Sequence, residues 1–221
     1  MLTALAIVGL LAAVPPAPAR WVTDETGQLA VDERDALNQQ LEAFEKATGH
    51  QVVVWVGRTT GGEPIEDWAV RTFEAWKVGR ARLDDGAALF VMLDDRVARI
   101  EVGYGLEERL TDAQSSRILR EVLIPKMQAG DATGGVTGAA RAMMSALGGA
   151  PESAPADAQP SRAQLYFFAV VAALLVVLFI VNPRAAFMLL MLLSSRRRGG
   201  RVGGFHGGGG RSGGGGATGR W

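Results

Sequence analysis

Residues 83–112 read LDDGAALFVMLDDRVARIEVGYGLEERLTD, and most of the fold follows from this stretch. Its first half holds a continuous apolar run, residues 87–93, which is typical of a central strand covered on both faces. Asp94 and Asp95 form a turn, after which apolar residues at 98, 100 and 102 alternate with charged ones. This alternation predicts a second strand with one face in water. The two strands therefore form a hairpin.

The same stretch is rich in acids, and the hairpin gathers several of them at one end of the sheet. Asp84 and Asp85 precede the first strand, while Glu107 and Asp112 follow the second. Grouped carboxylates repel each other unless they are solvated, paired or bound to a metal, and calcium prefers oxygen ligands. These four residues are therefore the predicted ligands of a divalent cation, with calcium as the expected ion. Alternatively, Asp84 and Asp85 form a simple turn and Asp112 stabilises a helix N-terminus.

Helical and strand periodicity predicts the other elements. Apolar residues at helical spacing indicate a helix over 32–47, and the β-rich run QVVVWV indicates a strand over 51–56. Pro64 begins a second helix, and Thr111 caps a third helix that ends at Pro125. A last helix carries the apolar stripe of residues 136, 140, 143 and 147.

The order of these elements predicts an α/β fold, a small sandwich of helices around a short mixed β-sheet, over residues 20–148. The chain has no cysteine, which excludes disulfides and zinc–thiolate sites and fits an exported domain that folds without cross-links.

Charge divides the chain in two. Residues 1–160 hold all 23 acids and 15 of the 23 Lys and Arg, a net charge of −8, so residues 161–221 carry +8. An acidic domain is thus joined to a basic C-terminal part.

A transmembrane region is expected over residues 164–193. Its first part, residues 165–181, has no charge and is about 25 Å long as a helix, near the lower limit for a bilayer. Asn182 and Pro183 interrupt it, which favours one long helix kinked there. A span followed by an interfacial or re-entrant piece is the alternative, and a buried core helix is a third interpretation.

Residues 1–19 resemble a signal segment, with cleavage after Ala19 or retention as an uncleaved anchor. Arg196, Arg197 and Arg198 follow the apolar region, so the positive-inside rule predicts a single-pass protein of the bacterial membrane. Its N-terminal domain is then extracytoplasmic, and its tail is cytoplasmic. Residues 149–163 form a Pro/Ala/acidic linker, and residues 194–221 a basic, Gly-rich tail that is expected to be disordered.

Several short motifs point to one family. They are VTDETGQL at 22–29, the β-rich run at 49–56, Phe73-x-x-Trp76-x-x-Gly79, Asp84-Asp85-Gly86, Arg99-Ile100-Glu101-Val102-Gly103-Tyr104-Gly105-Leu106-Glu107, Leu110-Thr111-Asp112 and Ile124-Pro125. Together with the membrane region and the Gly-rich tail, they resemble the TPM domain family. That family usually has Asp-Asn-Gly where this chain has Asp84-Asp85-Gly86. The resemblance implies an α/β sandwich, frequent divalent-cation binding, and acid-phosphatase activity in plant relatives.

Two functions remain open at this stage. The first is a membrane-anchored, cation-binding module that engages membrane-protein partners in assembly or quality control. The alternative is a metal-dependent acid phosphatase, a phosphomonoesterase, with its water near Asp84, Glu107 and Asp112. The catalytic residues are unknown, since the sequence has no complete nucleophile and base set. The expected partners are the lipid bilayer and a membrane protein, and no nucleic acid.

Overall fold

A computed structural model describes residues 14–148 and 204–221, which form an α/β domain of four helices around a five-stranded mixed sheet. The strands, in sheet order, are β1 (Val22–Asp24), β2 (Gln51–Gly57), β3 (Gly86–Met92), β4 (Val97–Gly103) and β5 (Ser212–Arg220). The helices are α1 (Val31–Thr48), α2 (Ile65–Trp76), α3 (Asp112–Ile118), α4 (Ile124–Gln128) and α5 (Ala132–Ala146). A π-turn (Leu119–Leu123) joins α3 to α4, so that these two form one continuous helical run.

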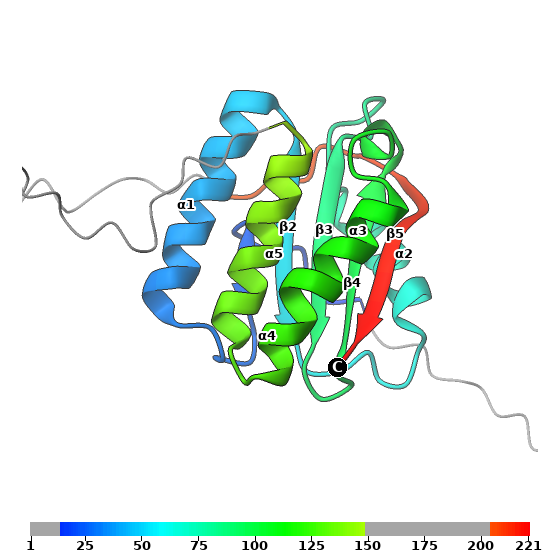
Figure 1. Ribbon diagram of the computed structural model, residues 1–221. Helices are drawn as coiled ribbons and strands as arrows, with labels where there is room; N and C mark the ends of the chain where they lie inside the picture. The colour runs from blue at the N-terminus through cyan, green and yellow to red at the C-terminus, as the bar shows by residue number, and fades with distance from the viewer. Residues whose placement is uncertain (1–13, 149–203) are drawn as a thin grey trace, which may run out of the picture. The chain divides into compact units, whose positions relative to one another are not determined.

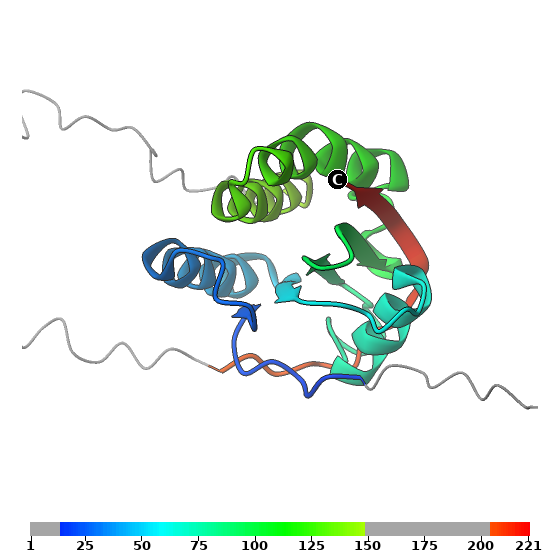
Figure 2. The same cartoon turned by 90° about the horizontal axis from the view of Figure 1, so that it is seen from below.

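Helices cover both faces of the sheet (Figure 1). Helices α3, α4 and α5 lie on one face, with α1 packed beside α5 and β2. Helix α2 lies on the opposite face, against β4 and β5, as Figure 2 shows. The predicted sandwich is therefore confirmed for these residues.

The predicted hairpin is confirmed. Strands β3 and β4 pair antiparallel, with Leu89 opposite Ile100, and the turn between them holds Asp94 and Asp95. Strand β2 pairs parallel with β3, and α2 connects the two, as a parallel pair requires. On its other side β2 pairs with the three-residue strand β1.

Two helix boundaries test the sequence rules. The capping box at Thr111 is present, because its side chain accepts from Gln114 N while the Gln114 side chain accepts from Thr111 N. The predicted helix end at Pro125 is wrong, since the helical run continues to Gln128. A π-turn directly before Pro125 lets the helix pass a residue that has no N–H and crowds the preceding turn.

The predicted wet face of β4 is also wrong. Arg99 and Glu101 point away from the apolar side of the strand, yet both are buried, with 5% and 0% of their surface exposed. Helix α2 lies over this face, and β5 covers the free edge of β4. Alternation of apolar and charged residues therefore marked the two faces of the strand correctly but not their exposure.

The disordered tail is the largest correction. Residues 212–220 form strand β5, which pairs antiparallel with β4, and Phe205 is buried in the domain core. A glycine-rich segment buries little apolar surface of its own. Here the domain supplies that surface, and the segment contributes backbone hydrogen bonds.

None of the helices in the described ranges is long and apolar enough to span a bilayer. The predicted transmembrane region 164–193, the linker 149–163 and residues 1–13 of the signal segment lie outside these ranges.

Candidate functional site

The C-terminal segment first contacts the domain near β1. Phe205 donates its N–H to the Ala19 carbonyl over 2.9 Å, and its ring packs edge-on against Trp21 at 6.3 Å between centroids. Next to it, the buried Gln51 amide donates to the His206 carbonyl over 2.9 Å. These contacts hold the segment at the end of the sheet where β2 begins.

The segment then crosses the loop that follows α2. Gly209 and Gly210 donate their N–H groups to the carbonyls of Lys77 and Gly79, each over 3.0 Å. Ala81 donates in the opposite direction, to the Gly208 carbonyl, over 2.9 Å. The tail is therefore hydrogen-bonded to the domain well before strand β5 begins.

Strand β5 lies in a groove formed by three elements. The groove is the edge of β4 between α2 and α3: β5 pairs with that edge and contacts α2 on one face of the sheet and α3 on the other. Figure 2 shows the two helices on opposite sides of β5. The backbone ladder runs from Val97 opposite Arg220 to Gly103 opposite Ser212, with Gly213 and Gly214 as extra residues in β5.

The groove has no space for side chains at several glycines. A Cβ on Gly207 would lie 1.9 Å from the Trp76 carbonyl oxygen, and one on Gly210 would lie 2.2 Å from the Val78 carbonyl oxygen. At Gly216 the Cβ would lie 1.9 Å from the Ile100 carbonyl oxygen, and φ is +127°. Since these neighbours are backbone atoms, they cannot swing away. The glycines are therefore required by close approach.

A buried ion pair lies beneath β5. Arg99 Nε donates to Glu101 Oε2 over 2.7 Å, and the Arg99 guanidinium also donates to the Gly214 carbonyl and to the Thr218 hydroxyl. The Ser212 hydroxyl hydrogen-bonds both Glu101 and the Val102 carbonyl. Burial raises the pKa of Glu101, although Ser212 and Arg99 oppose that effect. Three residues of the tail thus complete the hydrogen bonding of this pair.

Asp85, one of the four predicted cation ligands, is paired with an arginine. Its carboxylate accepts from Arg80 N and Arg80 Nε, each over 2.8 Å, and from the Arg80 guanidinium terminus. Burial acts to raise the pKa of Asp85, but the hydrogen bonds and charge of Arg80 outweigh it and the pKa is lowered. Asp85 therefore holds the loop before β3 in place.

Asp84 and Asp112 bind the tail instead. Asp84 Oδ1 accepts from Arg211 N over 2.8 Å, and Asp112 Oδ1 accepts from Gly216 N over 2.7 Å. Glu107 lies near Asp112 and Gly215, where these residues line an open hollow with Thr111 and Ala113. The hairpin does bring the acids to one end of the sheet, but the oxygens of Asp84, Asp85 and Asp112 face N–H groups.

The four predicted ligands are not assembled around one point in the described residues. Within residues 14–148 and 204–221 no three His, Asp or Glu side chains are placed to hold a metal ion. Asp84 and Asp85 direct their oxygens to different donors, Arg211 and Arg80. Gly103 and Gly105 bring the backbone of residues 83–84 close, since a Cβ on either would lie within 2.3 Å of a carbonyl oxygen there. Cation binding stays a prediction.

The described residues also hold no clear catalytic set. His50 Nδ1 lies 3.7 Å from Asp85 Oδ2, too far for a hydrogen bond, and Asp85 is already bound to Arg80. In a nucleophile–base set a third group orients the base through a hydrogen bond, and Asp85 does not make that bond to His50.

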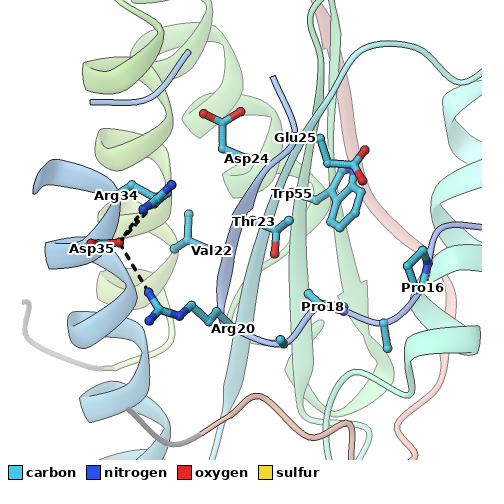
Figure 3. A pocket seen from close by; sticks show the side chains of 12 residues that line it. Pro16, Pro18, Arg20, Val22, Thr23, Asp24, Glu25, Arg34, Asp35 and Trp55 are labelled. Atoms are coloured by element: carbon cyan, nitrogen blue, oxygen red, sulfur yellow. Dashed lines mark hydrogen bonds and ion pairs between the residues drawn. The ribbon is translucent and has the colours of Figure 1, made fainter. Parts of the chain in front are cut away.

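A pocket lies beside β1 (Figure 3). Asp35 forms ion pairs there with Arg20 at 3.5 Å and Arg34 at 3.0 Å. Burial acts to raise the pKa of Asp24, but hydrogen bonds from Thr26 and the backbone of the next loop lower it. Residues 16–19 form one wall, so cleavage after Ala19 would remove part of this pocket.

The contacts that join the tail to the domain could not be read from the sequence. Arg99 and Glu101 stand in a family motif and Ser212 in none, but their pairing depends on residues more than a hundred positions apart. One signal was present: Phe205 and Trp221 are large apolar aromatic residues in a glycine-rich tail. Both pack against the core.

Comparison with known proteins identifies the family of this domain. The sequence model of the TPM domain matches residues 22–146, more than half of the chain. The chain belongs to the TPM domain family. The matched range includes β1 to α5 and ends before the C-terminal segment.

Solved structures also match this chain. The N-terminal domain of a protein from P. gingivalis, determined by solution NMR, is 32% identical with a TM-score of 0.56, over 61% of this chain and 85% of that chain. The NMR structure of BA42 from Bizionia argentinensis is 20% identical with a TM-score of 0.48, over 54% and 81%. The N-terminal domain of cg2496 from Corynebacterium glutamicum is 18% identical with a TM-score of 0.47, over 62% and 85%. No curated protein matches the chain.

Proposed function

We propose that this TPM protein is a membrane-anchored binding module that engages membrane-protein partners outside the cytoplasm. The apolar region 164–193 supports the anchor, and the signal-like residues 1–19 support export of the domain. The absence of cysteine agrees with a domain that folds without disulfides in an exported setting.

The observation that supports binding is the groove along β4. The β4 edge offers backbone N–H and C=O groups, and backbone carbonyl oxygens of Trp76, Val78 and Ile100 leave no space for a side chain at three glycines of the tail. Addition of an extended segment to a sheet edge is a common mode of peptide recognition, in which the backbone ladder supplies affinity. The domain's own tail fills the groove in this structure.

The contacts of the tail define the chemistry of the ligand. The segment must be extended and glycine-rich, with glycine at the positions equivalent to Gly207, Gly210 and Gly216. A hydroxyl at the position of Ser212 reaches Glu101, and an aromatic ring at the position of Phe205 packs on Trp21. We propose that a membrane-protein partner presents a segment of this kind, in exchange for the tail.

The exchange can be measured with the full-length protein. A tethered tail has a high effective concentration, so a free peptide should not displace it from the parent. Gly216→Val removes the tail from the groove, because its side chain meets the Ile100 carbonyl oxygen. A labelled peptide of residues 204–221 should then bind the variant and not the parent.

Two controls sharpen this test. A peptide that itself carries Gly216→Val should not bind. Gly204→Ala should behave as the parent, since a Cβ there finds its nearest neighbour at 3.5 Å. If circular dichroism shows the Gly216→Val protein folded and the unmodified peptide still fails to bind, the proposed binding function is wrong.

A further inference from the structure

We infer that the TPM domain and the C-terminal strand lie on the same side of the membrane, so that the segment between them returns to the side it leaves. This inference rests on the membrane anchoring proposed above. It also rests on an independent observation, the pairing of β4 with β5.

The pairing is a strict distance constraint. Paired strands lie about 4.8 Å apart, whereas the hydrocarbon core of a bilayer is about 30 Å thick. A chain that crossed the membrane once between Gly148 and Gly204 would leave β5 on the far side of that core. No ladder with β4 could then form.

Contacts outside the ladder impose the same constraint. Phe205 is buried against Trp21, and Gly209 and Gly210 bind the loop after α2. Beyond that loop, just before β5 begins, the Asp84 carboxylate accepts a hydrogen bond from Arg211 N. The tail is therefore joined to the domain at both edges of the sheet. Its position depends on several separate contacts and not on a single one.

Arg196, Arg197 and Arg198 favour the opposite topology, with the tail in the cytoplasm. That rule is a statistical bias in the charge of short loops, and it acts during insertion. Strand pairing in the folded protein allows no exception, because hydrogen bonds do not reach across a bilayer. We therefore place the expected cytoplasmic tail on the domain's side.

The absence of native cysteine makes a cross-linking test clean. Trp221 N donates to Arg96 O over 3.2 Å, so Val97 and Arg220 form a non-hydrogen-bonded pair. The Cα atoms of such a pair lie about 4.5 Å apart, which a disulfide can bridge. Val97→Cys with Arg220→Cys should close a disulfide on mild oxidation of native membranes.

The matched control moves one cysteine along the tail. Val97→Cys with Arg211→Cys places the thiols at opposite ends of β4, roughly 20 Å apart at about 3.4 Å per residue, and should stay reduced. Non-reducing electrophoresis and thiol-reactive polyethylene glycol distinguish the two states. A disulfide within one chain supports the inference. A disulfide between two chains supports it as well, because an exchanged strand still lies on the domain's side.

Labelling from one side of the membrane gives a second readout. Leu83→Cys in the domain and Arg220→Cys in the tail are both at exposed positions. A membrane-impermeant maleimide added to intact cells should label both. If both cysteines are labelled only after permeabilisation, the domain and the tail still lie on one side of the membrane. That result would support the inference but refute the extracytoplasmic location in the proposed function. Labelling of one without the other, with no disulfide in the first pair, would overturn the inference.

Discussion

Strands β4 and β5 are neighbours in one sheet, but different forces hold them there. Strand β4 reads VARIEVG, and all seven of its residues are buried. Strand β5 reads SGGGGATGR, and only Ser212 is fully buried. Side-chain packing and the Arg99–Glu101 pair hold β4 in place. Backbone hydrogen bonds, and the lack of side chains at its glycines, hold β5 in the groove.

The difference shows that glycine content has two physical meanings. Glycine-rich segments stay disordered when no surface is available to them, because they bury too little to offset the entropy of ordering. Beside a pre-formed sheet edge, glycine instead removes the steric barrier to close approach. On β4 the damaging change should be loss of a side chain, and on β5 it should be gain of one.

The largest effect is expected on β4. Glu101→Ala should lower the free energy of unfolding by roughly 3–5 kcal/mol, because it leaves the buried Arg99 without its charged partner. Arg99→Met combined with Glu101→Leu should stay much closer to the parent, because apolar residues of similar volume replace both charges. Chemical denaturation measures both. Equal losses in the single and double variants would contradict this account.

Deletion of residues 204–221 should have the next largest effect. Loss of Phe205 from the core alone is worth about 1.5–3 kcal/mol, and the β4 edge becomes exposed. For a domain of this size about 2 kcal/mol lowers Tm by roughly 4–8 °C. An unchanged Tm in calorimetry would mean that the tail does not pack on the domain.

Gly216→Val should destabilise the protein less than the deletion, by about 1–3 kcal/mol, because a clashing strand can at most detach. Hydrogen exchange should speed up at β4 amides and leave β2 unchanged. Gly204→Ala is the matched control, since its Cβ has ordinary space, and it should show neither change. Equal exchange rates at the β4 amides of both variants would contradict the proposal that β5 needs glycine at position 216 to approach β4.

Two buried carboxylates should respond to pH with opposite signs. The pKa of Glu101 is raised above 4.5, so its contribution to stability is present at low pH and is lost as pH rises through that raised value. The pKa of Asp85 is lowered below 3.8, so its contribution is present above 3.8 and is lost as pH falls through the lowered value.

The measurement compares Tm with pH for the parent, Glu101→Gln and Asp85→Asn. Relative to Glu101→Gln, the parent should gain stability as pH falls from 7 towards 4.5. Relative to Asp85→Asn, it should lose stability below about pH 3.8. Parallel curves for all three proteins would show that neither carboxylate has a shifted pKa.

Calcium should have the smallest effect. An ion bound only by the folded protein at a hundred times its Kd stabilises by about 2.7 kcal/mol. The thermal shift should be smaller than this, because Asp84, Asp85 and Asp112 already accept hydrogen bonds from the tail and from Arg80. A rise in Tm of the full size that Asp84→Asn abolishes would confirm the predicted cation site and show that the ion displaces these hydrogen bonds.

Local periodicity was enough to predict the central part of the fold. The run 87–93, the alternation after it and the cap at Thr111 each express a preference of a few neighbouring residues. The gathering of Asp84, Asp85, Glu107 and Asp112 at one sheet end also followed, because a hairpin returns the chain to its starting edge. Their partners could not be predicted, since Arg211 and Gly216 follow more than a hundred residues after Asp84 and Asp112.

From its sequence the chain was recognisable as an acidic α/β TPM domain with an apolar region and a basic, glycine-rich C-terminal part. These features depend on composition and on short-range pattern, which act along the chain. The burial of Arg99 and Glu101 and the order of the tail depend on surfaces that exist only after the sheet has formed. A glycine-rich segment carries no strand pattern of its own, so only the groove between α2 and α3 makes it a strand.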